Sequence, residues 1–137
     1  MTETLKIQIP IYREVLHVFF GSIEECIEAQ RKDGCKEIDI EEWRRHIEDK
    51  NPDGEYSLSN DTYHLIWQEC TPETILEYST LVHEIEHAVF YILDSRGLKH
   101  TEESDEAYAY LFGFLFCEID NYIVDEREKK EQESNNQ

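Results

Sequence analysis

A long stretch in the middle of the chain without a helix breaker is the strongest constraint on its fold. Neither glycine nor proline occurs between Pro72 and Gly97. Thr71 is a favourable N-cap followed by proline at the first helical position, and Gly97 is a typical helix stop. We therefore predict one long helix from about Pro72 to Ser95.

A second long helix is predicted after this one. From near Thr101 an apolar face continues to about Glu126, and only Gly113 weakens the helical pattern. The remaining residues, 127–137, are polar, and we expect them to form a frayed or disordered tail. A chain of 137 residues with 39% hydrophobic content suits a single domain, which we place at residues 1–126.

Four short runs before the long helices have the composition of β-strands. Residues 5–11 and 15–20 are predicted to pair as a hairpin, and residues 55–59 and 62–68 bracket a polar turn as a second hairpin. In the first run three residues alternate onto one side: Ile7, Ile9 and Ile11. We expect a short mixed or antiparallel sheet.

Two shorter helices are predicted between the hairpins. Ser22 is a favourable N-cap for the first, which Gly34 ends. Residues 39–49 place their apolar side chains on one stripe of the second. The predicted fold is therefore α+β, with the two-hairpin sheet packed on the two long helices.

The charge balance limits the partners of the chain. Thirty-two acidic against 13 basic residues give a net charge of -19, which surrounds the molecule with a negative potential. Nucleic acid is disfavoured, because phosphate binding depends on Lys and Arg contacts. Basic or neutral polypeptides are the better partners.

Targeting signals and cysteine motifs are not evident. No apolar run approaches the length of a membrane span, and residues 1–12 lack the order of a secretory signal, so we expect a cytoplasmic protein with no membrane partner. The cysteines are widely spaced without a C-x-x-C pair, and we expect buried free thiols: Cys26, Cys35, Cys70 and Cys117.

The long helix contains HEIEH at residues 83–87, which satisfies the H-E-x-x-H motif. Side chains four residues apart lie on one helical face, so His83 and His87 can bind one Zn²⁺ ion. Glu84 is turned about 100° away, where it can take a proton from water activated by the metal. Because the helix is heavily apolar, we expect both histidines to be partly buried. The motif predicts peptide-bond hydrolysis, with Glu84 as general base.

A catalytic zinc ion needs a third protein ligand, and the next helix supplies acidic candidates. We select Glu106, which lies where that helix turns apolar and faces the first. The alternatives are Glu102, Glu103 and Asp105, of which the first two occupy the exposed first turn. If the hairpin of helices is symmetric about Leu98, Glu106 lies nearly a turn from His87.

Two further parts of a peptidase site can be sought in the sequence. An oxyanion needs a hydrogen-bond donor opposite the metal, and the candidates are Tyr110, Tyr108, His64 and His100. A substrate can add as an extra strand to a sheet edge. We predict that residues 62–68 form this edge.

Residues 55–117 resemble the minigluzincins, compact single-domain zinc peptidases, and especially the ImmA/IrrE-like proteins of phages and mobile elements. The resemblance is carried by a hairpin, the motif residues His83, Glu84 and His87, and then Glu106 and Ala107 at the start of a helix. It implies a small zincin-like domain with one Zn²⁺ ion and Glu106 as the third ligand. The residues after Ala107, Tyr-Ala-Tyr and then LFGFLF, depart from the family pattern of Asn, Phe-Ala and L-L-M-P, so the resemblance does not extend to repressor cleavage.

The leading hypothesis is thus a zinc metallopeptidase acting on a polypeptide. A first alternative is a non-catalytic interaction protein in which a structural metal fixes two helices and the acidic surface binds a basic partner. A second is an acidic decoy that imitates nucleic acid and blocks a DNA-binding protein.

Overall fold

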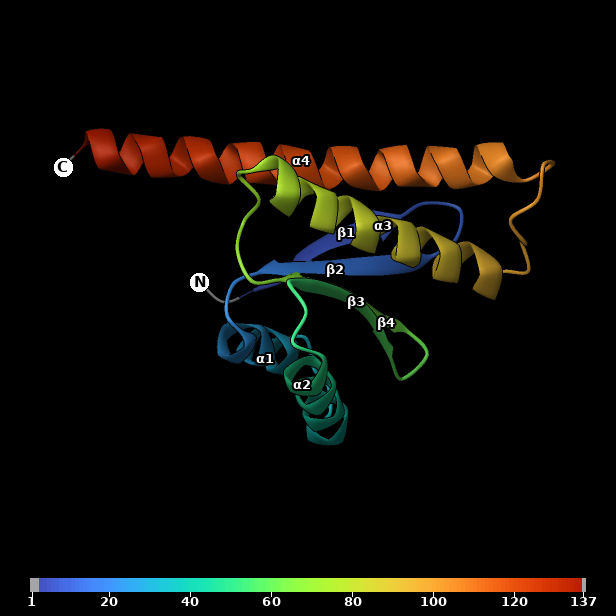
Figure 1. The fold of residues 1–137 in the computed structure, drawn as a ribbon, viewed down its shortest axis with the longest axis horizontal. Helices are drawn as coiled ribbons and strands as arrows, with labels where there is room; N and C mark the ends of the chain where they lie inside the picture. The colour runs from blue at the N-terminus through green and yellow to red at the C-terminus, as the bar shows by residue number, and fades with distance from the viewer. Residues whose placement is uncertain (1–2, 137) are drawn as a thin grey trace.

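The structure, a computed structural model, describes residues 3–136 and has an α+β fold (Figure 1). This part of the chain contains four helices and one four-stranded sheet. The elements follow the order β1 (Leu5–Ile9), β2 (Glu14–Phe20), α1 (Ile23–Lys32), α2 (Glu37–Lys50), β3 (Gly54–Ser59), β4 (Tyr63–Gln68), α3 (Ile75–Ser95) and α4 (Asp105–Asn135).

The sheet is mixed and has the strand order β1-β2-β4-β3. Both predicted hairpins are confirmed, because β1 pairs with β2 and β3 pairs with β4 in antiparallel fashion. The hairpins join through a parallel pairing of β2 with β4, in which Leu16 lies opposite His64. β4 is therefore an interior strand, which explains why five of its six residues are buried.

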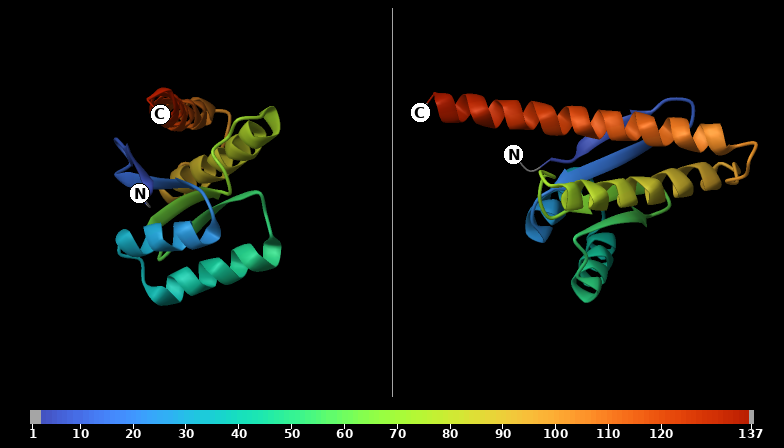
Figure 2. Two further views of the ribbon diagram at one scale, coloured as in Figure 1. Left: turned by 90° about the vertical axis from the view of Figure 1, so that its left-hand side faces the viewer. Right: turned by 45° about the horizontal axis from the view of Figure 1, so that its top comes forward.

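The elements form three layers with the sheet in the middle (Figures 1 and 2). One core lies between the sheet and the pair α3 and α4, and Leu16, Ile66 and Ile85 are among its fully buried residues. A second, smaller core lies between the other face of the sheet and the pair α1 and α2. It contains Trp43 and Trp67, whose rings meet edge to face with centroids 6.0 Å apart.

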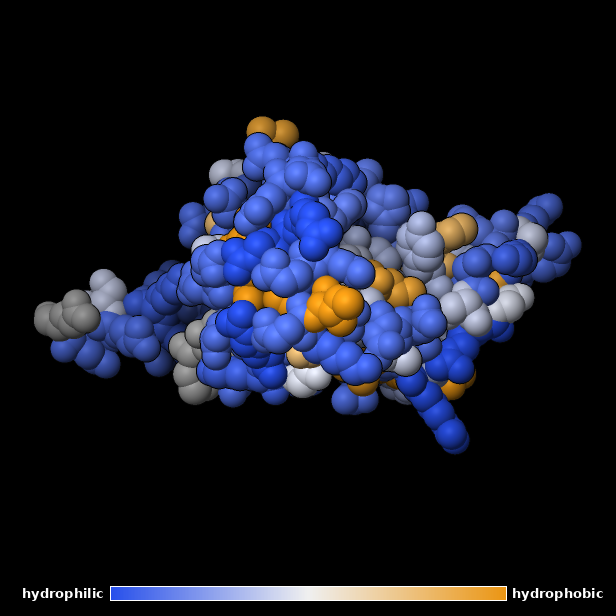
Figure 3. All heavy atoms as spheres, turned by 90° about the horizontal axis from the view of Figure 1, so that it is seen from below, coloured by the Kyte–Doolittle hydropathy of each residue, from blue (hydrophilic) through white to orange (hydrophobic). Residues whose placement is uncertain are grey.

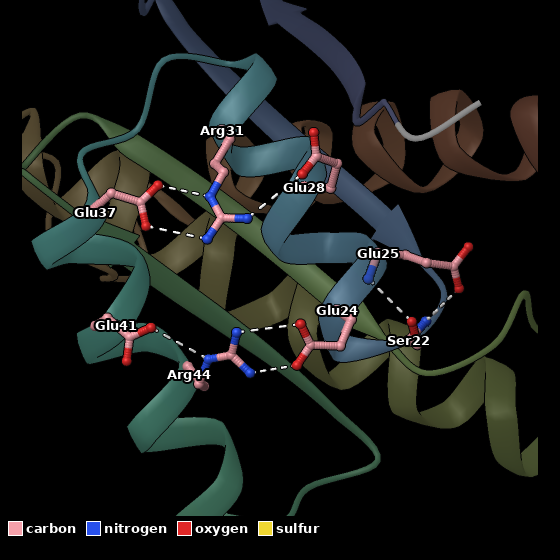
Figure 4. A network of polar contacts seen from close by, with 8 residues as sticks. All are labelled: Ser22, Glu24, Glu25, Glu28, Arg31, Glu37, Glu41 and Arg44. Carbon is pink, nitrogen blue, oxygen red and sulfur yellow. Dashed lines mark hydrogen bonds and ion pairs between the residues drawn. The ribbon is translucent and has the colours of Figure 1, made fainter.

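Local sequence signals define the two short helices. Ser22 and Glu25 form a capping box at the start of α1, and Gly34 follows its end with a φ of +88°. Ion pairs of Arg31 with Glu37 and of Arg44 with Glu24 connect α1 to α2 (Figure 4). They lie on the surface, and exposed ion pairs contribute little to stability. The face that carries these helices is mainly hydrophilic (Figure 3).

The first long helix begins later than predicted. Its N-cap is Thr74, which forms a capping box with Glu77, and not Thr71. The Glu77 carboxylate also accepts the Glu73 backbone N–H. A start at Thr74 therefore gives hydrogen-bond acceptors to more of the free backbone N–H groups of the first turn than a start at Thr71 and Pro72 would. The predicted end at Ser95 is confirmed.

The second long helix extends further than predicted. α4 has 31 residues and ends at Asn135, about 46 Å from its start at 1.5 Å per residue. Residues 127–135, which we expected to be frayed or disordered, are thus helical and exposed, and Figure 1 shows this end of α4 projecting past the other elements. No helix in residues 3–136 is long and apolar enough to cross a membrane.

Two expectations are wrong, one about the extent of the first strand, which ends at Ile9, and one about the burial of the cysteines. Ile7 and Ile9 belong to the core, but Ile11 is 89% exposed, because the chain has already entered the turn with a φ of +67° at this residue. The four cysteines are free, as expected, yet Cys70 and Cys117 are exposed instead of buried.

The observed cap of α3 can be tested by substitution. We expect Thr74→Ala to lower the free energy of unfolding by about 1 kcal/mol, because the Glu77 N–H loses its acceptor. Thr71→Ala is the matched control and should leave stability within about 0.5 kcal/mol of the wild type. Urea unfolding of both variants measures this, and a larger loss for Thr71→Ala would contradict the assigned cap.

Candidate metal site

The two histidines of the motif lie on the outer face of α3. Leu81, Ile85 and Ala88 are fully buried against the sheet and α4, whereas His83 and His87 are exposed. The expectation that the histidines would be partly buried is wrong. The apolar residues of α3 form a separate stripe that takes up its buried face, so the histidines point out of the core.

The two imidazoles converge on one another. Their Nε2 atoms are 3.1 Å apart, and the ring centroids are 4.7 Å apart with the planes at 80°. Two nitrogens bound at 2.0–2.1 Å to one tetrahedral zinc ion are about 3.3 Å apart. The pair therefore has nearly the separation that a shared ion requires, and the same distance also suits an N–H···N hydrogen bond between the rings.

Glu84 is buried beside the histidines and is bonded to the neighbouring strand. Its Oε1 accepts the backbone N–H of Tyr56 at 2.8 Å, and its Oε2 lies 3.9 Å from His83 Nε2. Burial raises the pKa of the Glu84 carboxyl above its usual value, against the opposing effects of the Tyr56 hydrogen bond and of the His83 charge. The Glu84 carboxylate thus faces the histidine pair and connects α3 to β3.

A cavity of about 360 Å³ adjoins all three motif residues. Its other acidic side chains are Asp53, which precedes β3, and Glu55, which is the second residue of β3. Glu55 Oε1 accepts from Lys50 at 2.9 Å, while its Oε2 is buried without a hydrogen-bond partner among the described residues. The cavity therefore contains histidine and carboxylate donors, the ligand types that zinc takes in proteins.

The structure does not bring the predicted third ligand to this cavity. Glu106 is exposed and lines a separate groove along α4 with Tyr110 and Cys117. Among the alternatives, Asp105 pairs with His100 at 3.0 Å, and Glu102 and Glu103 are exposed in the turn before α4. Within residues 3–136, no three His, Cys, Asp or Glu side chains converge closely enough to hold a metal ion.

The oxyanion candidates also lie outside the histidine cavity. Tyr108 donates its hydroxyl to the Leu98 carbonyl at 2.6 Å and stacks on His100. Tyr110 is 76% exposed on α4. His64 is 1% exposed in the interior of the sheet, so none of these residues lines the cavity beside Glu84.

His64 belongs instead to a buried polar chain that fixes Tyr56. Its Nδ1 lies 2.7 Å from the Tyr56 hydroxyl, and its Nε2 lies 3.3 Å from Glu14, which in turn pairs with Arg96 at 2.7 Å. The Tyr56 ring also stacks on Tyr91 with centroids 5.6 Å apart. The side-chain contacts of Tyr56 therefore fix the position of the backbone N–H that it donates to Glu84.

The edge strand beside the site is β3, not the predicted segment 62–68. That segment forms β4, which lies between β2 and β3. Because the Tyr56 N–H is directed to Glu84, and antiparallel strands alternate their bonding residues, Gly54 and Leu58 also direct their backbone groups to the outer edge of the sheet. Gly54 allows close packing here, since an added Cβ would lie 2.9 Å from the Thr80 methyl group.

Sequence reasoning missed the residues that β3 contributes. The strand itself was predicted, and Gly54 was part of the break before it, but nothing local marks β3 as the edge beside α3. That position follows only from the order in which the two hairpins pair.

Comparisons of the chain with protein-family models, with curated proteins and with solved structures gave no match in any of the three. The resemblance to minigluzincins therefore stays a prediction. A function for the chain is inferred from the geometry of its own site.

The contact between Glu84 and Tyr56 predicts a difference between two substitutions. Glu84→Ala leaves the buried Tyr56 N–H without an acceptor and should lower the free energy of unfolding by about 1–3 kcal/mol. Glu84→Gln keeps an acceptor oxygen and should lose less. Urea unfolding distinguishes them, and equal stability of the two variants would show that this hydrogen bond is unimportant.

Proposed function

We propose that the chain is a zinc-dependent peptidase whose site is formed by His83, Glu84 and His87. The observation that carries this proposal is the 3.1 Å separation of the two Nε2 atoms with the Glu84 carboxylate 3.9 Å from one of them. One turn of α3 supplies all three groups. They also share a cavity large enough for part of a substrate.

The donor set fits zinc, and His83 and His87 would hold it through Nε2. A bound zinc ion would supply Lewis-acid chemistry, polarising a carbonyl and acidifying water. The third protein ligand is best sought within the cavity, where Asp53 and Glu55 are the remaining carboxylates. Because no three donors converge within residues 3–136, one of these side chains would have to move toward the histidines to complete the site.

Glu84 is the residue placed to move the proton in hydrolysis. Its Oε2 faces the histidine pair, and its Oε1 is fixed by the Tyr56 N–H. A carboxylate held in this way can accept a proton from the attacking water and transfer it to the leaving amine. In this role, Tyr56 is a positioning residue.

The outer edge of β3 offers a path for an extended polypeptide on either side of Tyr56, whose own N–H is occupied by Glu84. The backbone groups of Gly54 and Leu58 face the edge, and the histidine cavity opens beside Gly54. Adding a strand to an exposed edge is a common mode of peptide recognition, in which backbone hydrogen bonds give affinity. This arrangement supports a polypeptide substrate over a small molecule.

One observation favours a second candidate function. The hydrogen bond from Tyr56 to Glu84 gives this glutamate a structural role, and a structural role requires no catalysis. In this second candidate the chain is a non-catalytic binding protein with a metal held between the histidines.

Metal content and hydrolysis together test the proposal. Elemental analysis should find one zinc ion per wild-type chain and loss of the metal in His87→Ala. Glu84→Gln should keep the zinc, while its hydrolysis of fluorescently labelled casein falls by about 10²-fold or more. Glu86→Gln, an exposed neighbour on the same helix, is the control and should retain activity. Zinc binding without hydrolysis in the wild type would favour the second candidate.

The location of the third ligand gives a separate prediction. In competition with a chelator, Glu55→Gln should weaken zinc binding by at least about tenfold, because Glu55 lines the histidine cavity and has an unpartnered oxygen. Glu106→Gln should bind zinc like the wild type, since Glu106 lies in another groove. A strong loss in Glu106→Gln would show instead that α4 moves toward α3 when the metal binds.

A further inference from the structure

A second cavity continues from the histidine cavity toward the start of α3. It has a volume of about 530 Å³ and lies between the end of β4, the segment that follows it and the first turns of α3. Three residues line both cavities, which makes the two spaces neighbours along one groove: Asp53, Ser79 and Thr80.

The charged side chains of this second cavity are all acidic. Asp53, Glu69 and Glu77 line it, and no lysine, arginine or histidine among residues 3–136 does. Within the described chain, the carboxylates of Asp53 and Glu69 have no ion-pair partner. Glu77 is held by backbone N–H groups of the helix cap and by Cys70, which lower its pKa to about 2. The cavity therefore stays negative throughout the neutral range.

A buried acceptor in the wall of this cavity lacks a donor. Gln68 is only 3% exposed and lines the cavity. Its Nε2 donates to the Glu77 carbonyl at 2.9 Å, but its Oε1 has no hydrogen-bond partner in residues 3–136. Buried polar atoms without partners are rare in folded proteins and call for an explanation. A ligand that brings N–H donors would supply one.

A lysine or arginine side chain satisfies both features of the cavity. Lysine and arginine side chains carry N–H donors and no acceptor, and their charge suits Asp53 and Glu69. Leu76, which is 80% exposed and also lines the cavity, offers an apolar surface for the methylene stem of such a side chain. Anionic groups are excluded by charge.

The distance between the second cavity and the histidines corresponds to a few residues of an extended peptide. Thr80 and Leu76 precede His83 by three and seven residues, or about 5–10 Å along the helix. An extended peptide advances about 3.3 Å per residue. A side chain in this cavity would thus belong to a residue one to three positions from the bond at the histidine pair.

We propose that this second cavity is a specificity pocket for a lysine or arginine side chain of a polypeptide, one to three residues from the bond that is cleaved. The inference rests on the proposed function for the path of the substrate backbone. Its experiment therefore needs a binding measurement that does not depend on catalysis.

Binding is tested with the Glu84→Gln variant of the 137-residue chain, titrated with acetylated and amidated heptapeptides that carry Lys, Arg, Gln or Glu among alanines and glycines. NMR of the ¹⁵N-labelled protein follows the Gln68 side-chain amide. We expect Lys and Arg peptides to bind about tenfold or more tightly than the Gln peptide, with a preference that shrinks at 1 M salt. Glu69→Gln should remove most of this preference. Glu73→Gln, with the same charge change outside the cavity, should not.

Hydrolysis of the same peptides by the wild type separates the two proposals. Cleavage one to three residues from Lys or Arg, found by mass spectrometry, supports both. Preferential binding of basic peptides without cleavage keeps the pocket and overturns the peptidase. Cleavage with equal kcat/KM for Lys and Gln peptides keeps the peptidase and overturns the pocket. If basic peptides are neither bound preferentially nor cleaved, both proposals are overturned.

Discussion

The hydrogen bond from the Tyr56 backbone to the buried Glu84 carboxylate joins the edge of the sheet to the helix that carries the motif. It joins two residues that are 28 positions apart in the sequence, with 2.8 Å between the nitrogen and the carboxylate oxygen. It connects β3 to α3 at the point where the cavity opens. Gly54 permits the same approach sterically, because any side chain there would meet Thr80. The width of the groove is fixed by these two contacts.

The helical period of α3 places its core residues and its site residues on different faces of the helix. Residues of one stripe, such as Leu81 and Ile85, are fully buried, and the histidines four residues apart occupy an outer stripe. Packing of its buried face holds α3 rigid. This fixes the backbone positions of His83 and His87. The polar chain from Tyr56 through His64 to Glu14 supports the opposite wall, and burial lowers the pKa of His64 despite the opposing Glu14 charge. Burial thus favours the neutral form of the His64 imidazole.

The basic residues that pair with acidic side chains are unevenly distributed over the molecule. Arg31 and Arg44 neutralise carboxylates between α1 and α2, and Lys50 pairs with Glu55 at one end of the groove. Toward the start of α3 no basic residue lines the groove. The acidic side chains that line this part of the groove therefore give it a local negative potential, which would attract a cation.

By itself the sequence determined what depends on neighbouring residues: both hairpins, the order of helices and strands, the end of α3, and the meeting of His83 with His87 one helical turn apart. These follow from periods of two and 3.6 residues and from breakers such as Gly97. Tertiary structure decided which strand is the edge, because the parallel pairing of β2 with β4 joins segments far apart in sequence. It also decided that Glu106 faces away from the histidines. The register between two long helices depends on side-chain packing along their whole length, and a shift of one turn, which no local pattern fixes, moves a ligand into or out of a site.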